Sequence, residues 1–182
     1  MVDYFAFLRG INVGGKNIIR MEDLTRIFVD CGFSGVKTYI QSGNVIFRYK
    51  KAGLTILSKK IEARVKEFIG NDIPVILRTR EQLNEMVKLN PYKDATVHKN
   101  AKLYVAFLSE VPSVSMILPM ISEKEGLELI SIINADAFLL SFEVNGHFGF
   151  PNNFIEKNLK VTASSRYWNT VLKMMEIELG KE

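Results

Sequence analysis

Along the first 90 positions, hydrophobic and polar residues follow the period of a strand in some segments and the period of a helix in others. A short apolar run over residues 4–8 has the length of a buried strand, and a glycine-rich loop follows it. Apolar residues then recur at helical spacing, and Gly32 follows the last of them, as glycine often does at a helix C-terminus. The residues of this stripe are Met21, Leu24, Ile27, Phe28 and Cys31. The pattern predicts a strand, a loop and a helix.

Two segments with strand-like alternation come next, VKTYI at 36–40 and VIFRY at 45–49. The turn residues of QSGN lie between them and predict a β-hairpin. A second helix, with Gly70 near its C-terminus, and a fourth strand, PVILRT at 74–79, then follow. The apolar face of this helix consists of Leu57, Ile61, Val65 and Phe68. The resulting order, βαββαβ over residues 1–90, predicts a ferredoxin-like first half.

A third helix is indicated directly after the fourth strand. Thr79 and Gln82 have the spacing of a capping box, in which each side chain accepts a hydrogen bond from the other residue's backbone N–H. Pro91 ends this helix, because the residue before a proline disfavours helical geometry. The polar stretch over residues 91–100 is the predicted linker to a second half, residues 101–182.

The second half begins the strand-rich pattern again. Strands are predicted for KLYVAFL at 102–108, LELISII at 127–133 and AFLLSFEV at 137–144, with a short helix from Ser113 to Pro119. Because the first strands of the two halves begin near Tyr4 and Tyr104, we expect an internal duplication. The second copy is expected to lack a closing strand and to end in a helix. The predicted fold class is α+β, with this related, incomplete half packed on the first as one compact unit.

The last helix carries one apolar and one polar stripe. The apolar stripe runs from Trp168 to Leu179, and Gly180 stands where a C-cap belongs. The opposite stripe holds Arg166, Asn169, Thr170 and Lys173, which share one helix face at this spacing. Asparagine and threonine are poor helix formers, so this face is unusual for a merely solvated one.

The glycine-rich loop reads GINVGGKN at residues 10–17, which fits the P-loop consensus except that Asn17 replaces Ser or Thr. Two further features argue against nucleotide hydrolysis. The helix is predicted to start near Arg20, several residues after Lys16, and no metal-binding carboxylate ends an apolar strand. Two interpretations stay open: the glycines supply only positive φ angles, or the loop with Arg9, Lys16 and Arg20 forms an anion site.

Composition changes this picture only in part. The 182 residues are 47% hydrophobic and 24% charged with a single cysteine, so a globular protein of the reducing cytoplasm is expected, without a membrane partner. The net charge of +4 is mildly basic. The densest basic stretches lie at 48–51 and 58–66, and the second of them has the pattern of a solvated helix face.

Common catalytic and metal-binding patterns are not found in the sequence. The two histidines do not have metal-ligand spacing, and no nucleophile elbow occurs. The segment SGNVIFRY does not fit the RNA-recognition consensus, because its aromatic residues are displaced by one position. Catalytic residues and any cofactor therefore remain unidentified, and no metal site is predicted.

Three motifs resemble an uncharacterised bacterial family labelled domain of unknown function 1697. They are LRGINVGGKN, VKTYIQSGNVIF and RYWNTVLKM, and the resemblance covers nearly the whole chain. It implies an α+β fold with two related halves and no established activity, substrate or cofactor. Matching these motifs selects the candidate ligand-binding residues Arg9, Gly10, Asn12, Gly14, Gly15, Lys16, Asn17, Gln41, Ser42, Asn44, Arg166, Asn169 and Thr170.

These observations favour a cytoplasmic binding protein that holds a phosphate-bearing small molecule at the glycine-rich loop. An enzyme acting on a phosphorylated molecule, a binder of the nucleic-acid backbone and a ligand-free interaction protein remain alternatives. In the expected sheet the first and third strands are antiparallel neighbours, so the QSGN turn should lie beside the glycine-rich loop. Lys16 is predicted to contribute to anion binding and little to stability.

Overall fold

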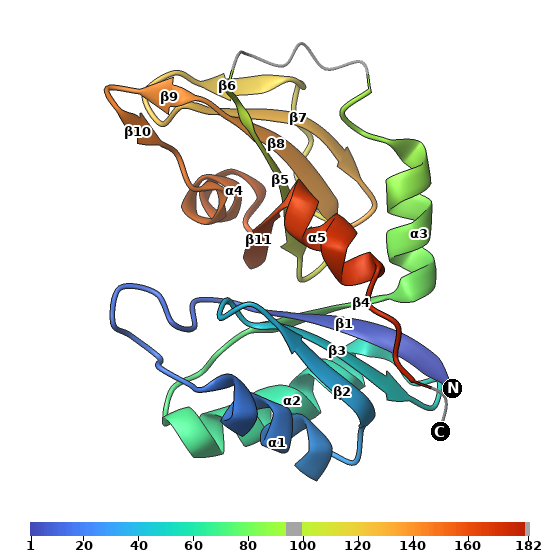
Figure 1. Ribbon diagram of the computed structural model, residues 1–182. Helices are drawn as coiled ribbons and strands as arrows, with labels where there is room; N and C mark the ends of the chain where they lie inside the picture. Colours follow the sequence, from blue (N-terminus) through green and yellow to red (C-terminus); the bar gives the residue numbers. More distant parts are fainter. Residues whose placement is uncertain (94–99, 181–182) are drawn as a thin grey trace. The chain divides into compact units, whose positions relative to one another are not determined.

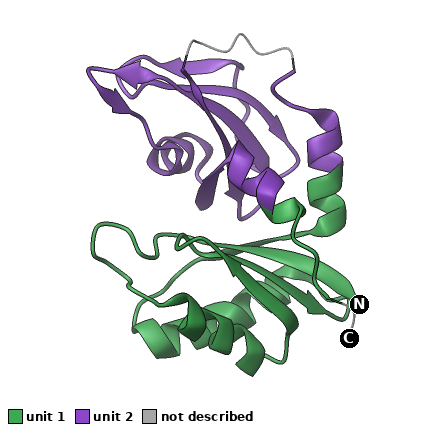
Figure 2. Cartoon of the chain, in the orientation of Figure 1, with its two compact units in different colours: residues 1–84, 174–182 green, residues 85–173 purple. Residues whose placement is uncertain are grey.

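The computed structural model describes residues 1–93 and 100–180 and divides them into two units (Figures 1 and 2). The first unit comprises residues 1–84 and 174–182, and the second comprises residues 85–173. Both boundaries fall inside helices, α3 (Arg80–Leu89) and α5 (Trp168–Met175). Most of the predicted linker at 91–100 lies outside the described residues.

The first unit contains a four-stranded antiparallel sheet in the order β2-β3-β1-β4. Its strands are β1 (Val2–Leu8), β2 (Ser34–Tyr39), β3 (Asn44–Tyr49) and β4 (Val75–Thr79). Helices α1 (Met21–Asp30) and α2 (Leu54–Ile69) follow β1 and β3 in the chain. This is the predicted order βαββαβ, with β1 and β3 as the central pair.

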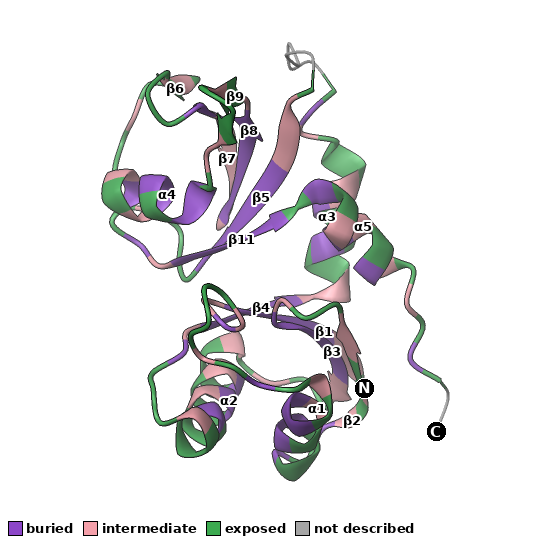
Figure 3. Cartoon of the chain, turned by 60° about the vertical axis from the view of Figure 1, so that its left-hand side comes forward, coloured by how far each residue is buried: buried purple, intermediate pink, exposed green. Residues whose placement is uncertain are grey.

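Helices α1 and α2 cover one face of this sheet and enclose its core (Figure 1). Leu24 and Phe28 of α1 and Ile61 of α2 are fully buried against the inward side chains of the strands. Figure 3 shows that the buried residues of both helices lie on the side toward the sheet. Phe68, which the spacing places on the apolar face of α2, is 52% exposed, unlike Leu57, Ile61 and Val65 of the same face.

Three helix ends have the local structure that the sequence predicts. Gly70 ends α2 in a left-handed conformation (φ +84°), and its N–H donates to the carbonyl of Lys66 over 2.7 Å. The capping box forms at the start of α3: the Thr79 N–H donates to Gln82 over 2.9 Å, and the Gln82 N–H to Thr79 Oγ over 3.2 Å. Helix α1 begins one residue after Arg20.

The C-terminal segment, residues 175–180, is bound to the rest of the first unit through its main chain. Arg80 donates to the carbonyls of Met175 and Ile177 over 2.9 Å each. Arg48 donates to the carbonyls of Leu179 and Gly180, and Lys37 donates to that of Glu178. Asp3 pairs with both arginines, over 2.9 Å to Arg48 and 3.1 Å to Arg80. Three cations thus hold five carbonyl groups of one short segment.

The second unit contains a five-stranded sheet in the order β11-β5-β8-β7-β6. Its strands are β5 (Lys102–Leu108), β6 (Met120–Ser122), β7 (Leu127–Ile133), β8 (Asp136–Ser141) and β11 (Ala163–Tyr167). Strands β9 (Glu143–Val144) and β10 (His147–Phe148) form a separate two-stranded ribbon. Helix α4 (Pro151–Leu159) packs Phe154, Ile155 and Leu159 onto one face of the main sheet.

Two predictions for the second half were wrong. Residues 111–117 form no regular structure instead of a helix, because Met116, Leu118 and Met120 alternate and pack inward as in an extended chain. The closing strand that was expected to be missing is β11, which pairs with β5. Its residues Ser164 and Ser165 are polar although they are buried. The sequence of β11 therefore does not contain the apolar residues by which a buried strand is predicted.

The strand orders of the two units correspond. In each unit the first strand lies between the closing strand and the third long strand, giving β4-β1-β3-β2 and β11-β5-β8-β7. The α+β class is therefore confirmed, while a duplication as the origin of this correspondence stays a prediction. Among the described residues, no helix combines the length and apolarity that a membrane crossing requires.

We predict that Cys31 resists thiol reagents in the native protein. The residue is 1% exposed, and burial raises the pKa of its thiol above the ordinary 9.0. Since the native state retains this proton, the free energy of unfolding should fall as the pH rises past the unfolded pKa of 9.0. Reaction with dithiobis(nitrobenzoic acid) at pH 8 should be about a hundredfold slower than in denaturant, and equal rates would contradict the prediction.

Candidate functional site

The glycine-rich loop is a small hairpin, which we call the glycine hairpin (residues 10–19). The Asn12 N–H donates to the carbonyl of Asn17 over 3.2 Å, and the Lys16 N–H to that of Val13 over 3.0 Å. Gly14 and Gly15 between them have φ angles of +57° and +73°. Two consecutive positive φ angles are typical of the tightest β-hairpin turns, and they explain the glycine pair.

Two asparagine side chains fix the conformation of the glycine hairpin. Asn12 Oδ1 accepts from the Ile19 N–H over 2.9 Å, and its Nδ2 donates to the carbonyls of Ile19 (3.0 Å) and Gln41 (3.2 Å). Asn17 Nδ2 donates to the Gly10 carbonyl over 2.9 Å. Both asparagines have positive φ angles, which this residue type tolerates better than most. Their amide groups are therefore used to build the loop.

The QSGN turn lies beside the glycine hairpin, as predicted. Asn44 pairs with Phe7 in the β1–β3 ladder, and the Leu8 N–H donates to the Gly43 carbonyl over 2.8 Å. Inside the turn, Asn44 Nδ2 donates to Ser42 Oγ over 2.8 Å and to the carbonyl of Tyr39 over 3.2 Å. Sequence reasoning thus correctly brought two of its three motifs together.

The tip of the glycine hairpin is open to solvent. Gly14, Gly15 and Lys16 are exposed, and the structure records no hydrogen bond from the two glycine N–H groups to any described residue. Arg20 is also exposed, and its Nε donates to Asp23 over 2.9 Å. Because α1 begins only at Met21, Lys16 lies in the hairpin and outside the helix. A P-loop requires its lysine at the helix start, so this loop is of another kind.

The third motif lies in the second unit and is not arranged as predicted. Arg166 belongs to strand β11, so it does not share a helix face with Asn169 and Thr170 of α5. The guanidinium is buried, donates to Ser164 Oγ (3.0 Å) and the Ser165 carbonyl (2.8 Å), and desolvation lowers the pKa of Arg166 to about 10. Asn169 is exposed and Thr170 half-buried. The candidate residues are therefore divided between two units.

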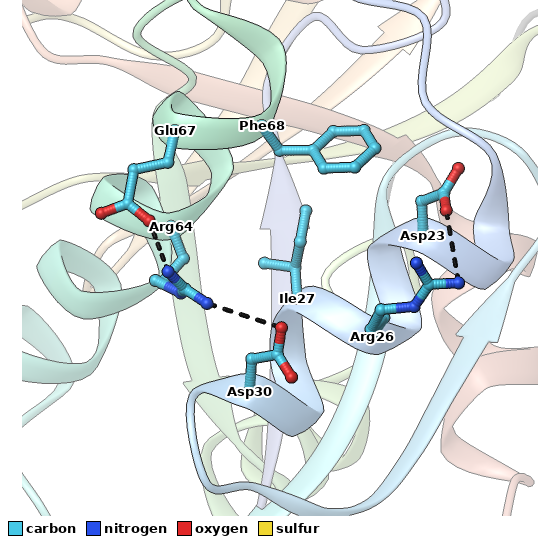
Figure 4. Close-up of a pocket in the computed structure, with 7 residues that line it drawn as sticks. All are labelled: Asp23, Arg26, Ile27, Asp30, Arg64, Glu67 and Phe68. Carbon is cyan, nitrogen blue, oxygen red and sulfur yellow. Dashed lines mark hydrogen bonds and ion pairs between the residues drawn. The ribbon is translucent and has the colours of Figure 1, made fainter.

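Sequence reasoning missed a pocket of about 220 Å³ between α1 and α2 (Figure 4). Its lining residues are Asp23, Arg26, Ile27, Asp30, Arg64, Glu67 and Phe68. Two signals could have found it. Positions 23, 27 and 30 lie on one helical stripe, and this stripe mixes two carboxylates with an apolar residue. Within the described chain, no group of three or more metal-ligating side chains is suited to a metal ion.

Comparison with other proteins identifies the family and the fold. The fold resembles that of the conserved bacterial protein SP0830 from Streptococcus pneumoniae, with a TM-score of 0.66, 20% identity and coverage of 97% of each chain. A search of curated proteins gave no match. The family model described as "Protein of unknown function (DUF1697)" matches residues 1–138. The chain therefore belongs to this family.

Proposed function

We propose that this chain is a cytoplasmic binding protein that holds a phosphate-bearing small molecule at the tip of the glycine hairpin. One observation carries the proposal: the tip presents the N–H groups of Gly14 and Gly15 together with the ammonium of Lys16 at the surface. Backbone N–H groups and a cation are the groups that bind phosphate oxygens in proteins.

The stiffness of the glycine hairpin supports this proposal. Asn12 and Asn17 hold the loop with four side-chain hydrogen bonds of 2.9 to 3.2 Å, and Asn71 donates to Asn17 Oδ1 over 3.0 Å. A loop fixed in this way loses little conformational entropy when a ligand binds. The hairpin needs no bound ligand for its fold, so its exposed glycine N–H groups are available to one.

The test is a titration with pyrophosphate, followed by calorimetry and by thermal unfolding. At a hundredfold the dissociation constant, the ligand should stabilise the wild-type protein by about 2.7 kcal/mol. Lys16→Ala should weaken binding by about tenfold, the effect of one charge-assisted contact, and should leave the unliganded melting temperature unchanged. Lys59→Ala is the matched control, because Lys59 is also exposed but lies on α2, and the binding of this variant should equal that of the wild type.

The other functions predict different results in the same experiment. If Lys16→Ala and Lys59→Ala bind pyrophosphate equally, the proposed site is wrong. Tight binding of an oligonucleotide with a steep dependence on salt would favour a binder of the nucleic-acid backbone. Release of orthophosphate during the titration would indicate an enzyme. If no phosphate-bearing probe binds, the alternative that remains is an interaction protein without a ligand.

A further inference from the structure

The pocket between α1 and α2 is a short groove with charged groups at both ends. Asp23 and Asp30 lie seven residues apart on α1, so the groove extends over about 10 Å at 1.5 Å per residue. Figure 4 shows Asp23 and Arg26 on one side, Arg64 and Glu67 with Asp30 on the other, and Ile27 between them.

One end of the groove, the acidic end, has more carboxylates than cations. Asp30 and Glu67 both pair with the single guanidinium of Arg64, over 3.5 Å in the case of Asp30. The side chains of both carboxylates are about half exposed, at 47% and 62%. Two negative charges face one positive charge here, so the net negative charge of this end attracts a further cation.

At the other end, the basic end, the guanidinium groups of two arginines lie near one buried carboxylate. The carboxylate of Asp23 is 8% exposed and accepts from Arg20 Nε over 2.9 Å. Arg26 comes only within 3.8 Å of it, which is too long for a hydrogen bond, and its side chain is 71% exposed. The guanidinium of Arg26 therefore keeps its planar fork of donors available, and this fork fits a carboxylate.

The middle of the groove is apolar. Ile27 forms its floor, and Phe68 lies across it from α2 (Figure 4). Phe68 stands at the spacing of the buried α2 stripe, yet 52% of it is exposed. A flexible hydrocarbon chain that covers this exposed ring and the apolar side chain beneath it removes apolar surface from water, and this favours binding.

We propose that this groove binds a small zwitterion whose single ammonium and single carboxylate groups are joined by an unbranched hydrocarbon chain, the chemistry of an ω-amino acid. The ammonium lies at the acidic end between Asp30 and Glu67. The carboxylate lies on Arg26, and the methylene groups cover Ile27 and Phe68. The site uses no residue of the glycine hairpin and is independent of the function proposed above.

The test uses 6-aminohexanoate as the probe, in titrations followed by calorimetry or by NMR. Hexanoate lacks the ammonium group and hexylamine lacks the carboxylate, so each can satisfy only one end of the groove. We expect 6-aminohexanoate to bind at least about tenfold more tightly than either, because it makes one more charge-assisted contact than each of them. Equal affinity for the three compounds, or no binding of 6-aminohexanoate, would overturn the proposal.

A change of charge at the basic end should reverse the preference of the groove. Arg26→Glu makes both ends acidic, so 6-aminohexanoate should bind at least about tenfold more weakly and 1,6-hexanediamine should bind more tightly than to the wild type. The matched control is Lys66→Glu, the same change of charge at a residue of α2 that pairs with Asp72 outside the groove. If Lys66→Glu reverses the preference equally, or Arg26→Glu does not, the assignment of the groove is wrong.

Discussion

Replacement of Gly43 by alanine should lower the free energy of unfolding by about 3 kcal/mol. Gly43 has a φ of +74°, and a Cβ atom there would lie 2.9 Å from Leu8 Cβ and 3.0 Å from the side chain of Ile11. The left-handed conformation costs an alanine roughly 1–2 kcal/mol, and crowding in a packed site adds a similar amount. Denaturation by urea, followed by circular dichroism, measures the loss.

Gly14→Ala is the control that separates the two contributions. Gly14 also has a positive φ, of +57°, but no atom lies within 4 Å of the position that its Cβ would take. We therefore expect a loss of only about 1 kcal/mol, from backbone strain alone. Equal losses for the two variants would show that crowding of the new Cβ atom against Leu8 and Ile11 does not lower the free energy of unfolding.

Phe47→Ala should be more damaging still, with a loss of about 4 kcal/mol. The ring is fully buried and lies at the centre of an aromatic cluster, with centroids 4.3 Å from Phe33, 5.3 Å from Tyr4 and 5.4 Å from Phe28. These partners come from the sheet, from α1 and from the segment after it. Truncation leaves a cavity that all of them line, and Phe→Ala in such a place typically costs 3–5 kcal/mol.

Two signals should be recorded for Phe47→Ala. Circular dichroism follows the whole chain, while the fluorescence of the single tryptophan, Trp168, follows the second unit, where it contacts Tyr92 and Phe138. Phe68→Ala is the matched control, because this ring is 52% exposed, and its loss should stay below about 1 kcal/mol. Similar losses for both variants would contradict the central place of Phe47.

Most of the first unit could be predicted from the sequence because its strands and its helices α1 and α2 carry local signals. Its C-terminal segment could not, since the apolar stripe continues to Leu179 but α5 ends at Met175. Glycines follow α1 and α2, the capping box opens α3, and alternation marks the two strands of the hairpin. The meeting of the QSGN turn with the glycine hairpin then followed from the strand order alone. The conformation of the hairpin did not, because it depends on contacts of Asn12 and Asn17 that no periodicity contains.

The second unit and the pocket depended on tertiary contacts that local pattern cannot supply. Strand β11 contains Ser164, Ser165 and Arg166, which are polar and nevertheless buried, so its sequence does not have the alternation of a strand. The spacing of the apolar residues placed Phe68 on the apolar face of α2, but spacing alone does not show which residues of such a face are covered by a neighbouring element. Phe68 lies near the end of α2, where it is half exposed and lines the groove between the helices.

The binding of residues 175–180 by Arg48, Arg80 and Lys37 also constrains the order of events during synthesis. These hydrogen bonds join residues 95 to 141 positions apart, so the cations leave the ribosome long before the carbonyls that they bind. At 5–20 residues per second, Arg80 is synthesised about 5–20 s before Met175. Asp3, which pairs with both guanidinium groups in the folded protein, is synthesised before either arginine and is therefore available to them throughout this interval.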